Sequence, residues 1–369
     1  MFVGIILSLL LCGTNVHGLV DSGDLFPQVQ NFSAFRHLVQ DMKSENYLQL
    51  NDKWSAAVNN EVVSPEWRGA SLDQLVDFFH DWYKWAPTGP KMAMSFLLRA
   101  QVITENNPAG VTFFHTNPGR EISKQFVVLH GMRMDSPESK HAADLWVEAV
   151  GPEGMQDYQV PVDGYPTFNA FFTRELKPGA RTIQAPFDDT GVVNPCDCYT
   201  KPISLELALD GDIHTKGHTL NVRTMLGNSS FASKFVNGSC YESILYARVY
   251  HHFHSPVAGH VVESNENVEG AYFGHHNPQQ GITLHRGYVI IKTKRFGYVG
   301  MMTLGLETVG SIVFDNKFKN VSKSHPPVPL YKGEHIGNFK YGGSAIYLVF
   351  EKDRFITTSP LGTQIGQFE

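Results

Sequence analysis

Hydrophobic residues in the first half of the chain follow the spacing of amphipathic helices. Ser71 is followed three residues later by Gln74, which is the capping-box pattern at the start of a helix. Apolar residues then recur every three or four positions from Leu72 to Tyr83, until a proline ends the run. A second apolar run over residues 91–102 predicts another helix. Both patterns are typical of helices that bury one face in a core.

The pattern changes from about residue 183 onward. Short β-prone runs alternate there with Gly and Pro, which is typical of a compact β-rich domain. The predicted strands are Ile244–Phe253, Val257–Glu263, Tyr288–Lys294, Tyr298–Leu304, Val309–Phe314 and Ala345–Phe350. A loop-like stretch over 152–164 separates the two patterns. We therefore predict an α+β protein with a helical region over 19–160 that packs on a β-rich core over 161–369.

The extreme N-terminus has the character of a targeting segment. The apolar run Phe2–Cys12 is short for a membrane span and fits the core of a signal peptide, although no basic residue precedes it. We place the cleavage after Gly18, so that residues 1–18 are a signal peptide and the protein enters the secretory pathway or leaves the cell. A short membrane anchor and a wrongly assigned start are the alternatives. Glycosylation sequons occur at Asn31, Asn228, Asn237 and Asn320.

Composition narrows the class of protein. The 369 residues leave room for about two domains. A net charge of −6 argues against nucleic-acid binding and against adhesion to anionic membranes by charge alone. Beyond the first 18 residues the cysteines are Cys196, Cys198 and Cys240, which permit one disulfide and one free thiol. Their pairing stays open.

Three histidines lie within four residues of one another. On a strand, His252 and His254 point to one face, and His251 points to the other with Phe253. Imidazole suits proton transfer near neutral pH. Metal binding would need a matching carboxylate or thiolate, and we predict no metal site. Core histidines held by hydrogen bonds are the alternative interpretation.

Two glycines stand directly before a serine near the C-terminus. Gly342 and Gly343 remove side-chain crowding, so that the hydroxyl of Ser344 can approach the carbonyl of its own preceding peptide bond. Attack on that carbonyl needs a base and a group that orients the base. Taken alone, this tripeptide is also typical of a flexible turn.

Four stretches, in this order, resemble the phosphatidylserine decarboxylase-type, pyruvoyl-dependent enzymes. They cover roughly residues 165–352, about half the chain, and are specific as an ordered set. The stretches are FNAFFTRELKPGAR (168–181), NPCDCYT (194–200) with KGHTLNVRTML (216–226), YHHFHSPVAG (250–259) and KGEHIGNFKYGGSA (332–345).

This resemblance implies a self-cleaving proenzyme. Ser344 would attack the carbonyl of Gly343, with His254 as the base and Asp197 as the residue that orients it. Elimination from the resulting ester would leave a long β chain that ends at Gly343 and a 26-residue α chain over 344–369. The α chain would begin with a pyruvoyl group made from Ser344. That group withdraws electrons as pyridoxal phosphate does elsewhere, so no external cofactor is implied.

The resemblance also suggests roles around the reacting centre. His254 or His251 would return a proton after carbon dioxide leaves. Arg181 and Lys216 are candidates for binding a substrate carboxylate or phosphate, with ordinary surface charges as the alternative.

Three positions depart from the family pattern. Cys198 follows the aspartate where glycine is usual, and it either distorts that turn or allows a flanking thiol to pair with Cys240. Ala345 follows the serine where a hydroxyl is common, which would slow processing. His252 stands where arginine is frequent. The serine, the base and the carboxylate are all retained.

The substrate is left open between two classes. The stretch over 71–101 resembles, more loosely, the accessory region of fungal tryptophan decarboxylases, which act on a soluble amino acid. The core motifs favour phosphatidylserine, with peripheral membrane contact, and a free amino acid such as tryptophan is the alternative. An inactive secreted binding module is the second alternative. The oligomeric state is not predicted.

Overall fold

The computed structural model describes residues 26–89, 95–105, 107–204, 207–210, 220–274, 283–306, 311–353, 355–356 and 364–367. The predicted signal peptide over 1–18 and the candidate Lys216 lie outside these residues. Helices fill the first half of the chain and strands the second, so the predicted mixed α+β class is confirmed.

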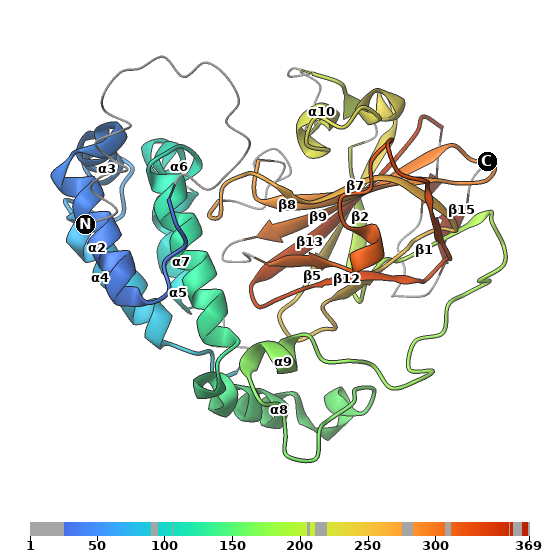
Figure 1. Cartoon of the computed structure of the whole chain (residues 1–369), viewed down its shortest axis with the longest axis horizontal. Coiled ribbons are helices and arrows are strands. Elements are labelled where there is room, and N and C mark those ends of the chain that lie inside the picture. The colour runs from blue at the N-terminus through green and yellow to red at the C-terminus, as the bar shows by residue number, and fades with distance from the viewer. Residues whose placement is uncertain are drawn as a thin grey trace.

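The helical half forms a bundle on one side of the molecule, with α8 and α9 below it (Figure 1). The helices are α2 (Phe32–Ser44), α3 (Leu50–Val58), α4 (Leu72–Lys84), α5 (Ser95–Thr104), α6 (Pro108–His115), α7 (Gly119–Met134), α8 (Lys140–Met155) and α9 (Phe168–Phe172). Short 3-10 helices include η2 (Pro137–Ser139) and η4 (Asn316–Phe318). None of the described helices is both long and apolar enough to cross a bilayer.

Helix α4 shows how local sequence sets the bundle. The capping box is present as predicted: the Ser71 side chain accepts from the Gln74 backbone, and the Gln74 side chain accepts from the Ser71 backbone. Its apolar stripe is buried, and Phe79 stacks on Phe126 of α7 with ring centroids 4.2 Å apart. Phe273, which follows β7, stacks on Phe79 at 5.9 Å. An aromatic residue of the β-rich half therefore belongs to the helical core.

A seven-stranded antiparallel sheet forms the centre of the second half, in the order β11-β7-β8-β9-β13-β5-β2. Its strands are β2 (Tyr199–Ser204), β5 (Ser239–Leu245), β7 (Gly259–Val268), β8 (Arg286–Lys292), β9 (Tyr298–Leu306), β11 (Val328–Leu330) and β13 (Gly343–Phe350). A three-stranded sheet has the order β10-β12-β6, from β10 (Ile312–Phe314), β12 (His335–Phe339) and β6 (His252–His254). Shorter pairings join β1 (Gly191–Val193), β14 (Phe355–Ile356) and β15 (Gln364–Gln367), and also β3 (Leu207–Ala208) and β4 (Leu220–Asn221), which α10 (Val222–Met225) follows.

The two faces of the large sheet bury different clusters. Along β13, Ile346 and Leu348 pack with Phe253 of β6, whereas Ala345 and Tyr347 pack on the opposite face. Side chains alternate along a strand, so Ser344 lies on the face of Ile346, in the layer between the two sheets.

Most predicted strands are confirmed with small shifts of their ends, but one expected strand is wrong. The run Ile244–Phe253 is not one strand, because a turn closed by Val249 N–H and the Tyr246 carbonyl separates β5 from β6. The cysteine pairing, which the sequence left open, is answered for the described cysteines: Cys196, Cys198 and Cys240 are free thiols. Cys196 and Cys240 pack into clusters on opposite faces of the sheet, which keeps these two thiols apart.

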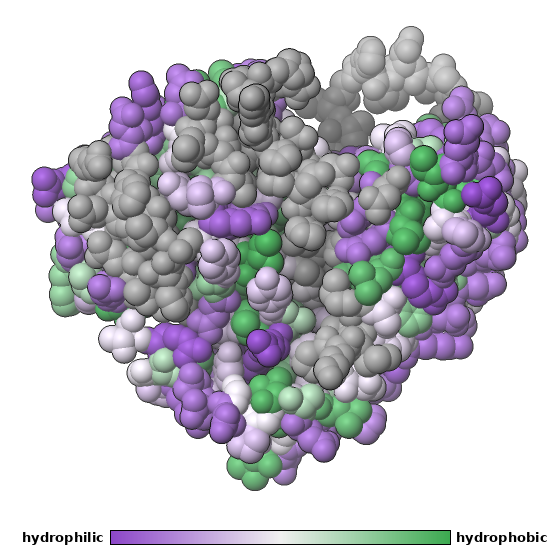
Figure 2. Space-filling model, turned by 180° about the vertical axis from the view of Figure 1, so that it is seen from behind, coloured by the Kyte–Doolittle hydropathy of each residue, from purple (hydrophilic) through white to green (hydrophobic). Residues whose placement is uncertain are grey.

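The opposite side of the molecule shows no single large hydrophobic area among the residues that are coloured. Hydrophilic and hydrophobic residues are intermixed there, with small hydrophobic groups near the middle and the lower edge (Figure 2).

Candidate active site

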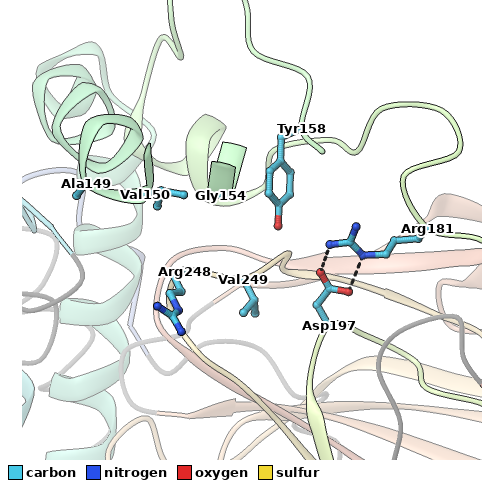
Figure 3. A pocket seen from close by; sticks show the side chains of 8 residues that line it. All are labelled: Ala149, Val150, Gly154, Tyr158, Arg181, Asp197, Arg248 and Val249. Carbon is cyan, nitrogen blue, oxygen red and sulfur yellow. Dashed lines mark hydrogen bonds and ion pairs between the residues drawn. The ribbon is translucent and has the colours of Figure 1, made fainter. Parts of the chain in front are cut away.

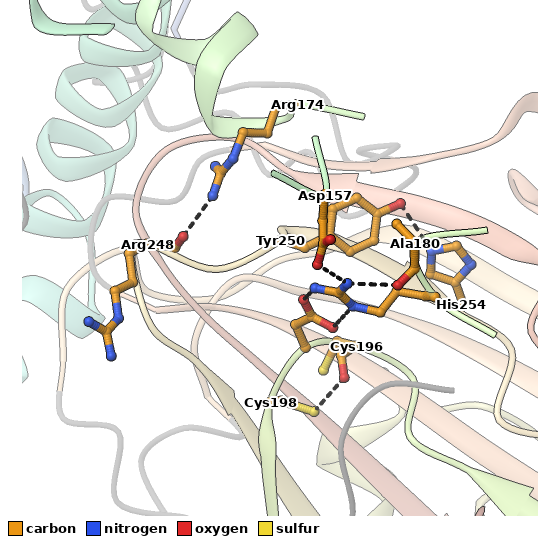
Figure 4. A network of polar contacts seen from close by, with 10 residues as sticks. Asp157, Arg174, Ala180, Cys196, Cys198, Arg248, Tyr250 and His254 are labelled. Atoms are coloured by element: carbon orange, nitrogen blue, oxygen red, sulfur yellow. Dashed lines mark hydrogen bonds and ion pairs between the residues drawn. The ribbon is translucent and has the colours of Figure 1, made fainter. Parts of the chain in front are cut away.

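Arg181 links two carboxylates from distant segments. Its Nε and Nη2 donate to the two oxygens of Asp197 at 3.1 and 2.8 Å, and its Nη1 donates to Asp157 at 2.7 Å (Figure 4). The Asp197 and Asp157 hydrogen bonds raise the pKa of Arg181 above its usual value, against the effect of burial. Arg181, predicted to bind substrate, is therefore engaged by side chains of the chain itself.

Hydrogen bonds and burial hold His254 as a neutral imidazole. Its Nδ1 donates to the Gly333 carbonyl at 2.9 Å, because a carbonyl only accepts. Its Nε2 then accepts from the Tyr250 hydroxyl at 3.1 Å (Figure 4). Burial lowers the pKa of His254 to about 4. The lone pair of the ring is thus on Nε2, where it accepts the hydrogen bond from Tyr250.

Asp197, His254 and Ser344 do not form a hydrogen-bonded triad in the intact chain. Asp197 binds Arg181, and His254 binds Tyr250 and Gly333. A backbone hydrogen bond of 2.7 Å from His254 N–H to the Pro195 carbonyl nevertheless places the histidine strand beside the segment that carries Asp197. The predicted roles of the three residues stay predictions.

Ser344 is completely buried at the start of β13. Its partners in the sheet are Leu245 of β5 and Gly305 of β9. Within the described part of the chain, its hydroxyl has no hydrogen-bond partner. Gly342, two residues earlier, has a φ of 144°, a backbone conformation that residues with a side chain rarely adopt. The unpartnered hydroxyl of Ser344 therefore lies in the layer between the two sheets.

His251 is the buried histidine on the other side of the cluster. It is fully enclosed, its ring stacks on Phe172 at 3.7 Å, and Phe172 contacts Tyr341 at 5.4 Å. Burial and nearby Arg174 hold the pKa of His251 well below its usual value. Tyr341 stands three residues before Ser344, so these ring contacts connect His251 with the approach to the cleavage site.

A pocket of about 330 Å³ lies beside the Arg181–Asp197 pair, and α8 forms one wall of it (Figure 3). Its lining residues are Ala149, Val150, Gly154, Tyr158, Arg181, Asp197, Arg248 and Val249. Arg248 lies at the opposite end from the Arg181–Asp197 pair, and its exposed guanidinium has no partner among the described side chains. Arg248 also lies in the turn between Leu245, which pairs with Ser344, and the histidine strand.

Sequence reasoning did not assign a role to Tyr250, Asp157 or Arg248. Tyr250 opens the histidine motif and Arg248 stands just before it, so their position beside that motif was the available signal. Asp157 carried no such signal, because its contact with Arg181 spans 24 residues of irregular chain. Cys198, the departure after Asp197, places its thiol 3.2 Å from the Cys196 carbonyl and closes the turn locally.

Comparisons with known proteins agree with the motifs. A sequence profile of the phosphatidylserine decarboxylase family matches residues 168–367. The phosphatidylserine decarboxylase proenzyme of Fusobacterium nucleatum is 31% identical over 257 residues, covering 68% of this chain and 80% of that protein. Proenzyme 3 of Schizosaccharomyces pombe is 30% identical over 67% of this chain, and proenzyme 2 of rice is 28% identical over 66%.

The relatives differ greatly in length. The match spans 27% of the Schizosaccharomyces pombe protein and 39% of the rice protein. The likeness of the helical region to fungal tryptophan decarboxylases stays a prediction. The profile match covers more than half of this chain and includes the histidine strand and Ser344. The chain therefore belongs to the phosphatidylserine decarboxylase family.

Proposed function

We propose that this chain is a proenzyme that cuts itself between Gly343 and Ser344 and then converts phosphatidylserine to phosphatidylethanolamine and carbon dioxide. The family consists of carboxy-lyases whose pyruvoyl group is made from a serine of the chain itself. The single observation that carries the proposal is the buried, unpartnered hydroxyl of Ser344 within the matched region.

The cut needs only groups that the chain carries, and the last step also uses one molecule of water. The Ser344 oxygen bonds to the Gly343 carbonyl carbon while the peptide C–N bond breaks, which leaves an ester and a free amine. Loss of the Ser344 α-proton with the Gly343 carboxylate then breaks the ester, and hydrolysis releases ammonia and leaves the pyruvoyl group. Neutral His254 is the proposed base, since its pKa of about 4 leaves it unprotonated at pH 7.

The surroundings of Ser344 fit such a group. The hydroxyl is enclosed in a mainly apolar layer, and the neighbouring strands hold the backbone of β13 on both sides. When formed, the pyruvoyl group supplies an electron sink for loss of the substrate carboxylate. Ser344 is fully buried, and His251 and His254 of the histidine motif are both neutral, as proton transfer by these rings requires.

The pocket beside Asp197 suits an anionic head group. Arg181 is already engaged by two carboxylates, whereas Arg248 is free to bind a phosphate or carboxylate in a bidentate manner. We propose that Arg248 anchors the phosphate of the substrate. Peripheral contact with a membrane, which a lipid substrate requires, and secretion through residues 1–18 remain parts of this proposal.

The mass of the freshly made, denatured protein tests the cut. We expect a 26-residue fragment that begins with a pyruvoyl group in the wild type and in the exposed control Ser324→Ala, and an intact chain in Ser344→Ala. An intact chain from folded wild-type protein would exclude self-cleavage and favour the inactive binding module.

Release of carbon dioxide tests the substrate. We expect release from phosphatidylserine vesicles and none from L-tryptophan. Release from tryptophan alone would support the alternative that the helical region suggests. Cleavage and substrate choice are thus tested separately.

A further inference from the structure

Two histidines of neighbouring strands form a chain of hydrogen bonds between two fixed acceptors. Asp315 Oδ2 lies 2.9 Å from His335 Nδ1, and His335 Nε2 lies 2.8 Å from His252 Nδ1. His252 Nε2 lies 2.9 Å from the Thr173 carbonyl. This row of hydrogen bonds thus connects the residue before η4, strands β12 and β6, and the segment that follows α9.

The number of protons in this row of hydrogen bonds follows from the acceptors at its two ends, Asp315 and Thr173. The Thr173 carbonyl only accepts, so His252 Nε2 carries a hydrogen. A carboxylate also only accepts, so His335 Nδ1 carries a hydrogen. The central bond between the two rings needs a third hydrogen. Two neutral imidazoles have only two N–H groups, so the pair carries one extra proton, balanced by the Asp315 carboxylate.

We infer that the Asp315–His335–His252 chain is a charged clamp that positions the histidine strand for self-cleavage, with Asp315 and His335 as positioning residues. Its connection to cleavage rests on the proposed function. Its charge state rests on the hydrogen bonds alone.

Burial shows which ring carries the charge. The His252 side chain is 4% exposed, and burial lowers its pKa to about 4. The His335 side chain is 33% exposed and adjoins Asp315, whose side chain is 40% exposed. His335 is therefore the imidazolium, paired with Asp315, and His252 is the neutral acceptor of its second N–H.

The charged and titratable neighbours are compatible with this assignment. Glu175 lies 3.9 Å from His252 Nε2, on the side where that nitrogen carries its hydrogen. The Tyr250 ring stacks on His252 at 4.6 Å, and neutral His254 lies 5.3 Å from His335. On η4 and just before β12, Lys317 and Glu334 pair with each other. Asp197 interacts electrostatically with His254 from the adjoining segment.

The clamp connects the groups that the proposed chemistry uses. His335 pairs with His254 in the β12–β6 register. Thr173 directly follows Phe172, whose ring stacks on His251. Strand β12 ends four residues before β13 begins at Gly343. Loss of the extra proton would leave a lone pair on both His335 Nε2 and His252 Nδ1. The two nitrogens would then repel each other, which would weaken the packing of β6 against β12.

Nitrogen NMR of histidine-labelled full-length protein tests the charge state directly. The Ser344→Ala background keeps the chain intact, and His335→Gln and His252→Gln assign the two signals. At pH 7 we expect both ring nitrogens of His335 to be protonated, and His252 to be neutral with its hydrogen on Nε2. Two neutral rings would overturn the inference, whether or not the protein cleaves itself.

Self-cleavage in the natural Ser344 background tests the positioning role. We expect Asp315→Asn to slow cleavage at pH 7 by roughly tenfold, as loss of one hydrogen bond to a charged group predicts. We expect Asp315→Glu, which keeps the charge, to restore most of the rate. Lys317→Gln is the matched control, since it removes a neighbouring ion pair on the same segment. Equal rates in Asp315→Asn and Lys317→Gln would overturn the positioning role.

Discussion

Replacing Arg181 by glutamine separates two possible roles of this arginine. In the structure it forms three charge-assisted hydrogen bonds, two with Asp197 and one with Asp157. Glutamine is polar but shorter than arginine, and it leaves both carboxylates without a counter-charge. If Arg181 braces Asp197, the variant loses stability and cleaves slowly. If Arg181 binds substrate, stability and cleavage stay normal and KM rises.

The loss of stability can be worked out from the geometry. A hydrogen bond to a charged group contributes about 1.5–3 kcal/mol, and solvent exposure reduces this value. The side chains are 25% exposed at Arg181, 16% at Asp197 and 39% at Asp157. We therefore expect Arg181→Gln to lower the free energy of unfolding by about 2–4 kcal/mol. Arg181→Lys keeps the charge but not the two-pronged geometry, and should lose about half as much.

Urea denaturation of the uncut Ser344→Ala protein measures this loss, and the time course of cleavage with Ser344 present gives the second readout. Arg223→Gln is the matched control, because Arg223 makes a similar two-pronged contact with Asp210 on the surface. Exposure makes that contact weak, so the control should lose little stability. Equal losses in Arg181→Gln and Arg223→Gln would refute the reasoning.

Three further expectations can be measured independently. Arg248→Gln should raise KM for phosphatidylserine roughly tenfold with little change in cleavage; an unchanged KM would remove Arg248 from substrate binding. Tyr250→Phe removes the hydrogen bond that stabilises the neutral ring of His254, so the pKa of His254 should rise and the pH profile of cleavage should shift to higher pH. An unchanged profile would contradict the hydrogen bond. Buried histidines with a folded pKa near 4 hold fewer protons in the folded protein than in the unfolded chain. Their contribution to stability should therefore be full above about pH 6.5 and fall toward pH 4, by up to about 1.4 kcal/mol per pH unit each. Denaturation at stepped pH checks this, and a flat curve would contradict the burial of His130, His252, His254 and His285.

The elements that could be predicted are those specified by nearby residues. Helix α4 has its cap, its apolar stripe and its end within a short stretch, and the structure follows that pattern. Strand β13 is a continuous apolar run that is buried on both faces. Strand β12 was not predicted, because it lies within a glycine-containing motif and is a strand only by pairing with β10 and β6. The long predicted strand at 244–253 failed because β-prone residues also occur in the turn over 246–249.

Within the site, residue types could be predicted but their partners could not. The motifs predicted Asp197, His254 and Ser344 as site residues, since each lies in a recognisable local pattern, and their roles stay predictions. The choice of Arg181 as the partner of Asp197 depends on how two irregular segments pass each other. His335 and Asp315 meet His252 only because β12 lies beside β6, 83 residues apart in sequence. No local pattern contains such information.

The cost of breaking existing hydrogen bonds distinguishes Arg181 from Arg248 as a ligand for the substrate. An anion that bound Arg181 would have to displace a carboxylate that already makes charge-assisted hydrogen bonds. Giving up one such bond costs about 1.5–3 kcal/mol, which corresponds to roughly 10- to 100-fold in affinity. Arg248 lines the same pocket and has no internal partner to displace among the described side chains. An anionic head group should therefore bind at the Arg248 end of the pocket, in the turn that joins the strand paired with Ser344 to the histidine strand.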